Sequence, residues 1–198
     1  MDSINIKYIS EKFLNFSASS IKKINSDYNK SAVMCLFFEN DNKVYILLTK
    51  RSEKLKNHAG EICFPGGRVE KKDLDPLDTA LRETFEEVGV SRDKIKVIGQ
   101  LDDYITGTGF HISTFVGILE AKQNLLMNKN EVSEIIYLPL DVIKNKKNFI
   151  WSCKKFGNKE YKFWKINYID YNIWGATASI IVSLASKIFY QQIKRDII

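Results

Sequence analysis

The hydrophobic positions of this chain fall into short β-branched and aromatic runs separated by polar turn residues, a pattern that predicts several β-strands. The runs at 32–38 and 43–50 are divided by the sequence ENDN, which indicates a hairpin. Two further runs, at 94–106 and 111–121, lie on either side of a GTGF turn. A shorter strand is predicted at 134–140.

Three longer helices are predicted between and after these strands. Apolar and charged residues recur at helical spacing over 6–27, as one helix or two short ones, and further helices are expected at 76–88 and 174–193. Residues 149–168 predict a late hairpin with the sequence GN at its tip, and a short helix near 140–146 precedes it. Because strands and helices do not alternate regularly, the pattern indicates an α+β fold with a mixed sheet.

The helix predicted at 76–88 has clear signals at both ends. Asp75 is a good N-cap, Pro76 suits the first helical position, and Asp78 lies where a capping-box acid is expected. Gly89 can adopt the left-handed conformation that ends a helix. These signals fix the position of the helix within the sequence.

The two sides of this helix carry different side chains. One side is apolar and is expected to face the core, through Leu77, Leu81, Phe85 and Val88. The other side carries three carboxylates, those of Glu83, Glu86 and Glu87, which repel one another by about 0.2–0.5 kcal/mol per pair. A divalent cation would remove this repulsion, because Mg²⁺ prefers oxygen ligands. The alternative is a solvated acidic face.

Length and composition limit the classes of protein that remain. With 198 residues, of which 44% are hydrophobic, the chain can form one domain with a packed core. Its net charge of +6 suits a solvated Lys-rich surface, and it also attracts anionic ligands without choosing among them. Since no recognised RNA or DNA motif is present, we expect no nucleic-acid partner.

The cysteines and apolar segments indicate a cytoplasmic protein. Cys35, Cys63 and Cys153 are odd in number and widely spaced, which favours reduced thiols. No apolar segment of the signal-peptide type opens the sequence. The apolar run near the C-terminus is interrupted by polar residues and Lys187, so we expect a docked helix, packed onto the sheet by Trp174, and no stable membrane association.

The loop before the acidic helix changes the interpretation of its carboxylates. The sequence Gly66-Gly67 lets the backbone turn sharply and present a carbonyl or an N–H group to a ligand. Together with a spacer acid and RETFEEVGV (82–90), it resembles the Nudix hydrolase signature. The sequence departs from the signature in two places. Thr84 takes a position that is usually apolar. Asp73 takes the place of the usual Glu, and the spacing from Asp73 to Arg82 is one residue longer than in the signature.

A second motif lies just upstream. The sequence LLTKRSEKLKNHAGEICFPGG (47–67) resembles the additional motif of the coenzyme A diphosphatase branch of that family, with Lys56 in place of the usual Arg. The matching residues are Arg51, Ser52, Leu55, His58, Gly60, Phe64 and Pro65. The sequence IWGATASII is similar to the start of the last helix of the same branch. Together the two motifs are far more specific than either alone.

This resemblance implies a fold and a reaction. The fold would be a Nudix fold at 31–198, with a mixed β-sheet between helices (α/β/α), preceded by a helical extension at 1–30. The reaction would be metal-dependent hydrolysis of the diphosphate bond of coenzyme A or acyl-CoA, giving 3′,5′-ADP and (acyl-)4′-phosphopantetheine. The alternatives are the same chemistry on ADP-ribose or a dinucleotide, and a non-catalytic Nudix-like binding module. Whether the chain forms a homodimer stays open.

The resemblance also assigns residues to the site. The metal ligands to Mg²⁺ or Mn²⁺ would be Glu83, Glu86, Glu87 and the backbone of Gly67, with Arg82 as an orienting catalytic residue. One carboxylate would orient or deprotonate the attacking water, and the sequence does not choose which. Substrate contacts would come from Arg51, Ser52, Lys56, His58 and Gly66. Two candidates for a further loop acid are Glu131 and Glu134.

Overall fold

The computed structural model describes residues 4–14, 27–119, 124–156 and 159–190. Its helices are α1 (Ile6–Glu11), α2 (Pro76–Val88), α3 (Leu140–Lys144) and α4 (Gly175–Ile188), with short 3-10 turns η2 (Arg92–Lys94) and η3 (Lys146–Asn148). None of these helices combines the length and apolarity that crossing a bilayer requires.

The main sheet is mixed, as the sequence predicts. Its central strands, in the order β3-β2-β1-β7-β5, are β3 (Ile62–Cys63), β2 (Lys43–Arg51), β1 (Asn29–Asn40), β7 (Phe110–Leu119) and β5 (Ile95–Gln100). Three more strands pair with this path: β4 (Gly66–Arg68) with β1, β6 (Tyr104–Ile105) with β7, and β8 (Val132–Pro139) with β2. The pair β1–β7 is parallel and the other pairs are antiparallel.

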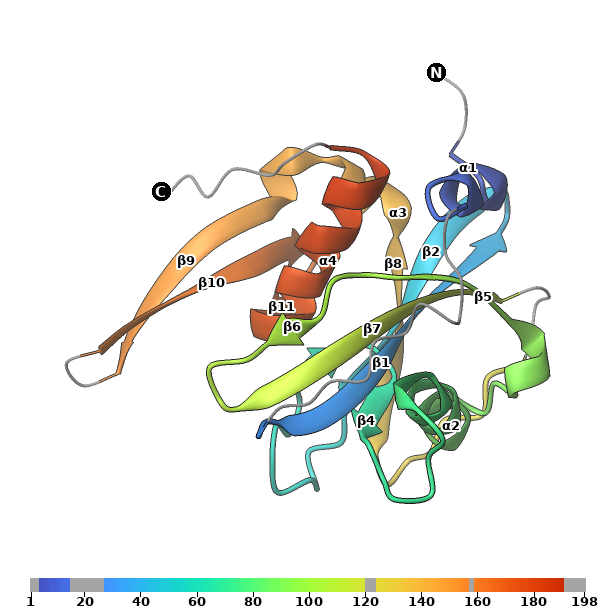
Figure 1. The fold of residues 1–198 in the computed structure, drawn as a ribbon. Helices are drawn as coiled ribbons and strands as arrows, with labels where there is room; N and C mark the ends of the chain where they lie inside the picture. The colour runs from blue at the N-terminus through green and yellow to red at the C-terminus, as the bar shows by residue number, and fades with distance from the viewer. Residues whose placement is uncertain (1–3, 15–26, 120–123, 157–158, 191–198) are drawn as a thin grey trace.

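A smaller antiparallel sheet follows in the order β11-β10-β9, from strands β9 (Phe149–Phe156), β10 (Lys159–Tyr168) and β11 (Tyr171–Trp174). Strands β9 and β10 form an arm that projects from the body of the molecule (Figure 1). Strand β11 leads directly into α4, and α4 packs against the main sheet.

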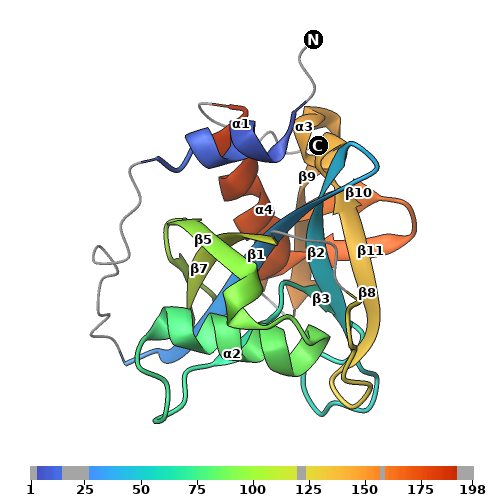
Figure 2. The ribbon, with the colours of Figure 1, turned by 90° about the vertical axis from the view of Figure 1, so that its right-hand side faces the viewer.

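Alternating side chains of β1 produce two cores, one on each face of the main sheet. Met34 and Leu36 pack with Ala80 and Val88 of α2 on one face. Residues of opposite parity, such as Cys35 and Phe37, pack with α1 and α4 on the other face. Helices α2 and α4 therefore lie on opposite sides of the sheet (Figure 2), which confirms the α/β/α arrangement.

Most predicted strands and helices are confirmed within a few residues. The ENDN turn places Asp41 and Asn42 at φ 49° and 58°, the left-handed conformation that a two-residue hairpin needs. The predicted helix at 6–27 is shorter where the structure describes it, since α1 ends at Glu11, and residues 15–26 lie outside the described part. The tip of the late hairpin also lies outside it.

Several expectations about individual elements are wrong. The segment before the acidic helix, which the Pro and Gly residues at 65–67 predict to be a loop over residues 51–74, is not all loop, because β3 and β4 form within it and pair with β2 and β1. Strand β11 was not predicted, and α4 ends at Ile188 rather than at residue 193. Trp174 does not pack α4 onto the sheet; it is 38% exposed, and its ring meets Phe163 of β10 edge-on.

The core face of α2 is also rotated from the prediction. Phe85 is 57% exposed, and Thr84 lies in the core instead with no exposed surface. The reason is geometric, because a face centred between Leu81 and Val88 passes through position 84. Thr84 is accommodated because its hydroxyl donates to the Ala80 carbonyl within the helix, so no buried polar group is left unpaired.

Candidate active site

The acidic helix is held at both ends by the residues that the sequence indicates. The Asp75 carboxylate accepts a 2.8 Å hydrogen bond from the Asp78 N–H, and Pro76 occupies the first turn. Gly89 ends the helix with φ 74°, and its N–H donates to Phe85 O. The caps fix where the helix begins and ends, and the packing of its apolar side decides which carboxylates point toward the sheet.

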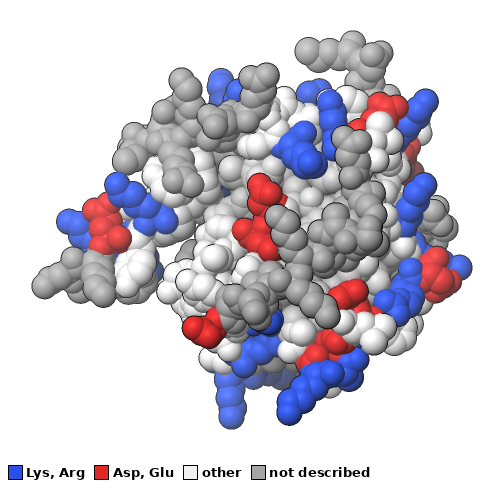
Figure 3. Space-filling model, in the orientation of Figure 1, with Lys and Arg blue, Asp and Glu red and all other residues white. Residues whose placement is uncertain are grey.

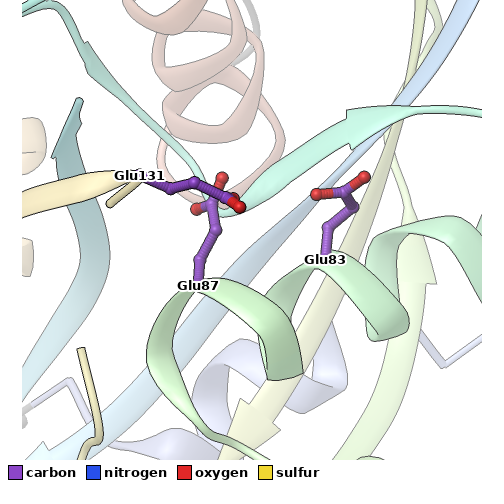
Figure 4. Close-up of side chains that lie close together, drawn as sticks. All are labelled: Glu83, Glu87 and Glu131. Carbon is purple, nitrogen blue, oxygen red and sulfur yellow. The ribbon is translucent and has the colours of Figure 1, made fainter. Parts of the chain in front are cut away.

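Three carboxylates from two segments meet beside the helix. One oxygen each of Glu83, Glu87 and Glu131 lies within 4.8 Å of the others. Glu83 and Glu87 extend from α2 toward Glu131, which precedes β8 (Figure 4). The main chain closes the group, since Asn128 N donates to the Glu87 carbonyl and Ser52 N donates to the Glu131 carbonyl.

Burial makes this group electrostatically costly in the absence of a cation. Glu87 is 3% exposed, and burial, with the charge of Glu83 as the next cause, raises its pKa to about 8. Burial also raises the pKa of Glu83, although the adjacent Arg82 opposes this. Carboxylates disposed in this way lose their mutual repulsion when a hard cation lies between them.

Gly67 is the point where β4 passes closest to the helix. A Cβ atom at this position would overlap the carboxylate of Glu83, so the absent side chain is what gives that carboxylate its place. Gly66 is equally constrained, because a Cβ there would overlap the backbone of β1 at the Ala32 carbonyl. The Gly-Gly sequence therefore lets one strand lie tightly between β1 and the acidic helix.

Arg82 and Asp73 form a bidentate ion pair that supports the acidic face. Arg82 Nε and Nη2 donate to the two Asp73 oxygens at 2.9 and 3.1 Å, and the Asp73 side chain is 1% exposed. Arg82 Nη1 reaches Glu83 at 2.8 Å and Glu86 at 3.0 Å. The Arg82 hydrogen bond holds the pKa of Asp73 well below its usual range. Asp73 therefore holds Arg82 in place beside the acidic face despite its shorter side chain.

Glu86 is placed differently from the other two helix carboxylates. Its side chain is 41% exposed, it is bound to Arg82, and it lies outside the group of three. Glu131 takes the third place in that group. The other candidate loop acid, Glu134, accepts a 2.6 Å hydrogen bond from the Tyr171 hydroxyl of β11 instead. A metal-binding role for Glu86 stays a prediction.

Strands β2 and β3 form the floor beneath Glu87. Thr49 is 1% exposed, and its hydroxyl lies 3.4 Å from both Glu87 Oε2 and the Cys63 thiol. Arg51, two residues along, acts electrostatically on both Glu87 and Cys63, and its buried Nε has no hydrogen-bond partner in the described part of the chain. Burial raises the pKa of Cys63 to about 11, which excludes a reactive thiolate at neutral pH.

The remaining predicted residues lie on the loop between β2 and β3. Ser52 is 5% exposed, and its hydroxyl accepts from the Lys54 N–H, so its contacts are with the loop and with Glu131. His58 is exposed, has a left-handed backbone with φ 58°, and contacts the Glu61 carboxylate at 3.0 Å. Lys56 is exposed. Sequence reasoning did not assign a role to Thr49, although it is the third residue of the motif at 47–67, because that match gives no sign that its side chain reaches Glu87.

The donor set fits a hard divalent cation. All three side chains offer carboxylate oxygens, and neither histidine nor cysteine belongs to the group. Oxygen ligands of this kind suit Mg²⁺ or Mn²⁺ and not a thiolate-binding metal. The cation positions themselves, and the contribution of the Gly67 carbonyl, stay predictions.

The fold and this site define the class of protein. A mixed sheet between helices, with a carboxylate helix packed beside a Gly-Gly strand, is the arrangement of a Nudix-type hydrolase. The chain belongs to the Nudix family, since residues 28–156 match the NUDIX domain.

Related proteins agree with this assignment. The chain is 34% identical over 163 residues to the uncharacterized Nudix hydrolase NudL of Photorhabdus laumondii, covering 82% of this chain and 87% of that protein. It is 31% identical over 175 residues to the peroxisomal coenzyme A diphosphatase NUDT7 of Mus musculus, covering 82% and 72% of the two chains. A MutT/nudix family protein from Enterococcus faecalis has a similar fold, with a TM-score of 0.53, 15% identity, and coverage of 93% and 74%.

Proposed function

We propose that this Nudix hydrolase cleaves the diphosphate bond of coenzyme A or an acyl-CoA, with Mg²⁺ or Mn²⁺, to give 3′,5′-ADP and (acyl-)4′-phosphopantetheine. The observation that carries the metal-dependent chemistry is the group formed by Glu83, Glu87 and Glu131, whose oxygens lie within 4.8 Å. Similarity to a mouse coenzyme A diphosphatase, and the motif at 47–67, support the choice of substrate.

Each acidic residue has a role in binding and orientation. Glu83, Glu87 and Glu131 would hold the cation, which would supply charge neutralisation of the diphosphate and a lowered pKa of a water molecule. Arg82 restrains Glu83 through its 2.8 Å contact, and Asp73 restrains Arg82. One of the carboxylates accepts a proton from the attacking water.

Arg51 is the cation best placed to meet the substrate. Its charge acts on Glu87, and its buried Nε has no hydrogen-bond partner in the described part of the chain, so we place its guanidinium group near the carboxylates with a donor left for a ligand. Arginine binds phosphate oxygens in a bidentate manner. Because Arg51 lies at the carboxylates, we assign it to the diphosphate rather than to the 3′-phosphate. Lys56 and His58, exposed on the following loop, are then the candidates for the 3′-phosphate.

The test is a substrate panel. Purified protein is incubated with CoA, an acyl-CoA, ADP-ribose and a dinucleotide in Mg²⁺ or Mn²⁺, and products are identified by mass. We expect 3′,5′-ADP from CoA at the highest kcat/KM. If ADP-ribose or the dinucleotide is cleaved at the highest kcat/KM, the proposed diphosphate hydrolysis would stand, but coenzyme A would not be the preferred substrate. No cleavage of any of them would favour a binding module.

Arg51→Ala separates the two phosphate assignments. If Arg51 meets the diphosphate, KM should rise equally for CoA and for 3′-dephospho-CoA. If the loop meets the 3′-phosphate, Lys56→Ala should raise KM for CoA alone.

A nucleic-acid role has less support. On the face drawn in Figure 3, lysines and arginines are scattered and acidic groups lie among them, so no continuous basic track is visible there. We therefore expect RNA neither to bind tightly nor to inhibit CoA cleavage at physiological salt. We expect the reaction to take place in the cytoplasm, and a homodimer stays a prediction.

A further inference from the structure

Thr49 occupies a position in the floor of the site that the reaction, as described so far, does not use. It lies on β2 between two neighbouring strands, in register with Cys63 of β3 and Ile135 of β8. Its side chain points to the α2 face, where its hydroxyl meets Glu87 Oε2 at 3.4 Å. Only 1% of the residue is exposed. A strand threonine thus reaches across to the helix that carries the acidic residues.

The chemistry of the two groups fixes the direction of this contact. A carboxylate that holds a cation is ionised and only accepts hydrogen bonds, so in the cation-bound site the Thr49 hydroxyl would donate to Glu87. The lone pairs of the same hydroxyl face the Cys63 thiol at 3.4 Å, and a thiol can donate to them. The result is a short chain of hydrogen bonds that runs from the Cys63 thiol through the Thr49 hydroxyl to the Glu87 carboxylate.

A donor is needed at this point because of what else surrounds Glu87. Glu83 and Glu131 lie within 4.8 Å and repel it, and Glu87 is too buried for water to hold its orientation. A carboxylate has two oxygens, so a donor fixed on Oε2 leaves Oε1 for a cation. Groups that orient a metal ligand in this way raise the affinity of the site, and their loss typically weakens metal binding by about 10–100-fold.

We propose that Thr49 is a positioning residue that holds the Glu87 carboxylate in its metal-binding orientation, with Cys63 behind it as a secondary support. This inference rests on the proposed function, because it assumes a divalent cation between the carboxylates.

The experiment measures Mn²⁺ affinity by electron paramagnetic resonance, without substrate. Thr49→Val keeps the shape of the side chain and removes the donor, so we expect affinity to fall about tenfold. Thr49→Ser restores the donor and should restore the affinity. Cys63→Ala should have a smaller effect than Thr49→Val, because the hydroxyl can still donate without the thiol.

Thr84→Val is the matched control. Thr84 is also fully buried with a bonded hydroxyl, but its contact is to Ala80 O within α2, away from the carboxylates. We expect this variant to bind Mn²⁺ as the wild type does, and thermal melts of all variants report whether each one folds.

Three results would overturn the inference, and they are distinguishable. Wild-type affinity in a folded Thr49→Val variant would show that the hydroxyl positions nothing. Equal weakening by Thr49→Val and Thr49→Ser would assign the effect to packing of the methyl group. Absence of Mn²⁺ binding in the wild type would remove both this role and the proposed metal-dependent function.

Discussion

Replacing Glu87 by Gln should make the metal-free protein more stable while removing its function. In the folded protein the pKa of Glu87 is about 8, against 4.5 for an unperturbed glutamate. Each pKa unit corresponds to about 1.4 kcal/mol, so keeping Glu87 ionised in the fold without metal costs roughly 5 kcal/mol. The amide is uncharged, has a similar shape, and avoids this cost.

The sign of the pH dependence follows from the raised pKa. Below pH 4.5 the carboxyl group is protonated in both the folded and the unfolded chain, and the cost is absent. Between pH 4.5 and about 8, Glu87 is ionised in the unfolded chain but largely protonated in the folded one, so wild-type stability falls as pH rises. Above pH 8 the cost is constant. Glu87→Gln should therefore have no advantage near pH 5 and its largest advantage near pH 9.

The assay is thermal unfolding in EDTA across this pH range. Burying the amide also has a cost, so we expect a net gain of about 2 kcal/mol at pH 9, which corresponds to about 4–8 °C for a domain of this size. In saturating Mg²⁺ the order should reverse, because only the wild type gains binding energy from the ion. Turnover of the variant should fall by orders of magnitude.

Glu86→Gln serves as the matched control, since that side chain is 41% exposed and solvated. Its stability should differ little from that of the wild type at either pH. In EDTA, the stability difference between Glu87→Gln and the wild type should change between pH 5 and pH 9. An equal difference at both pH values would show that burial does not raise the pKa of Glu87.

Three further predictions concern residues in and around the site. Glu131→Gln should reduce turnover in saturating Mg²⁺ by orders of magnitude, because Glu131 belongs to the group of three carboxylates. Glu134→Gln should leave kcat unchanged, because Glu134 contacts Tyr171 instead. An equal loss of turnover in both variants would contradict the placement of Glu131 with Glu83 and Glu87. Gly67→Ala should displace the Glu83 carboxylate and lower kcat while the melting temperature stays close to wild type, and unfolding instead would contradict this. Asp73→Asn should lower the unfolding free energy by about 1–3 kcal/mol at pH 7. The deficit should shrink progressively below pH 4, because Asp73 is then protonated in the unfolded chain while the folded protein still holds it ionised; chemical denaturation at pH 7 and below pH 4 measures this.

Local signals in the sequence determined the elements closest to the chemistry. Asp75, Pro76 and Gly89 act over one helical turn, so their meaning does not depend on the rest of the fold, and α2 begins and ends where they indicate. The ENDN turn and its flanking β-branched runs likewise specify the β1–β2 hairpin. Strand β11, only four residues long, escaped prediction because such a short run is stabilised by pairing with β10 and not by its own propensity.

The sequence by itself determined that an acidic helix follows a Gly-Gly turn, because helical spacing and backbone freedom are properties of neighbouring residues. Only the tertiary structure decided which carboxylates meet. Packing rotates α2 so that Glu87 is buried while Glu86 stays 41% exposed, and the pairing of β8 with β2 brings Glu131 rather than Glu134 to the group. The motif at 47–67 includes Thr49, but only strand pairing across long separations in the chain places its hydroxyl beside Glu87, so the contact itself could not be predicted from the sequence.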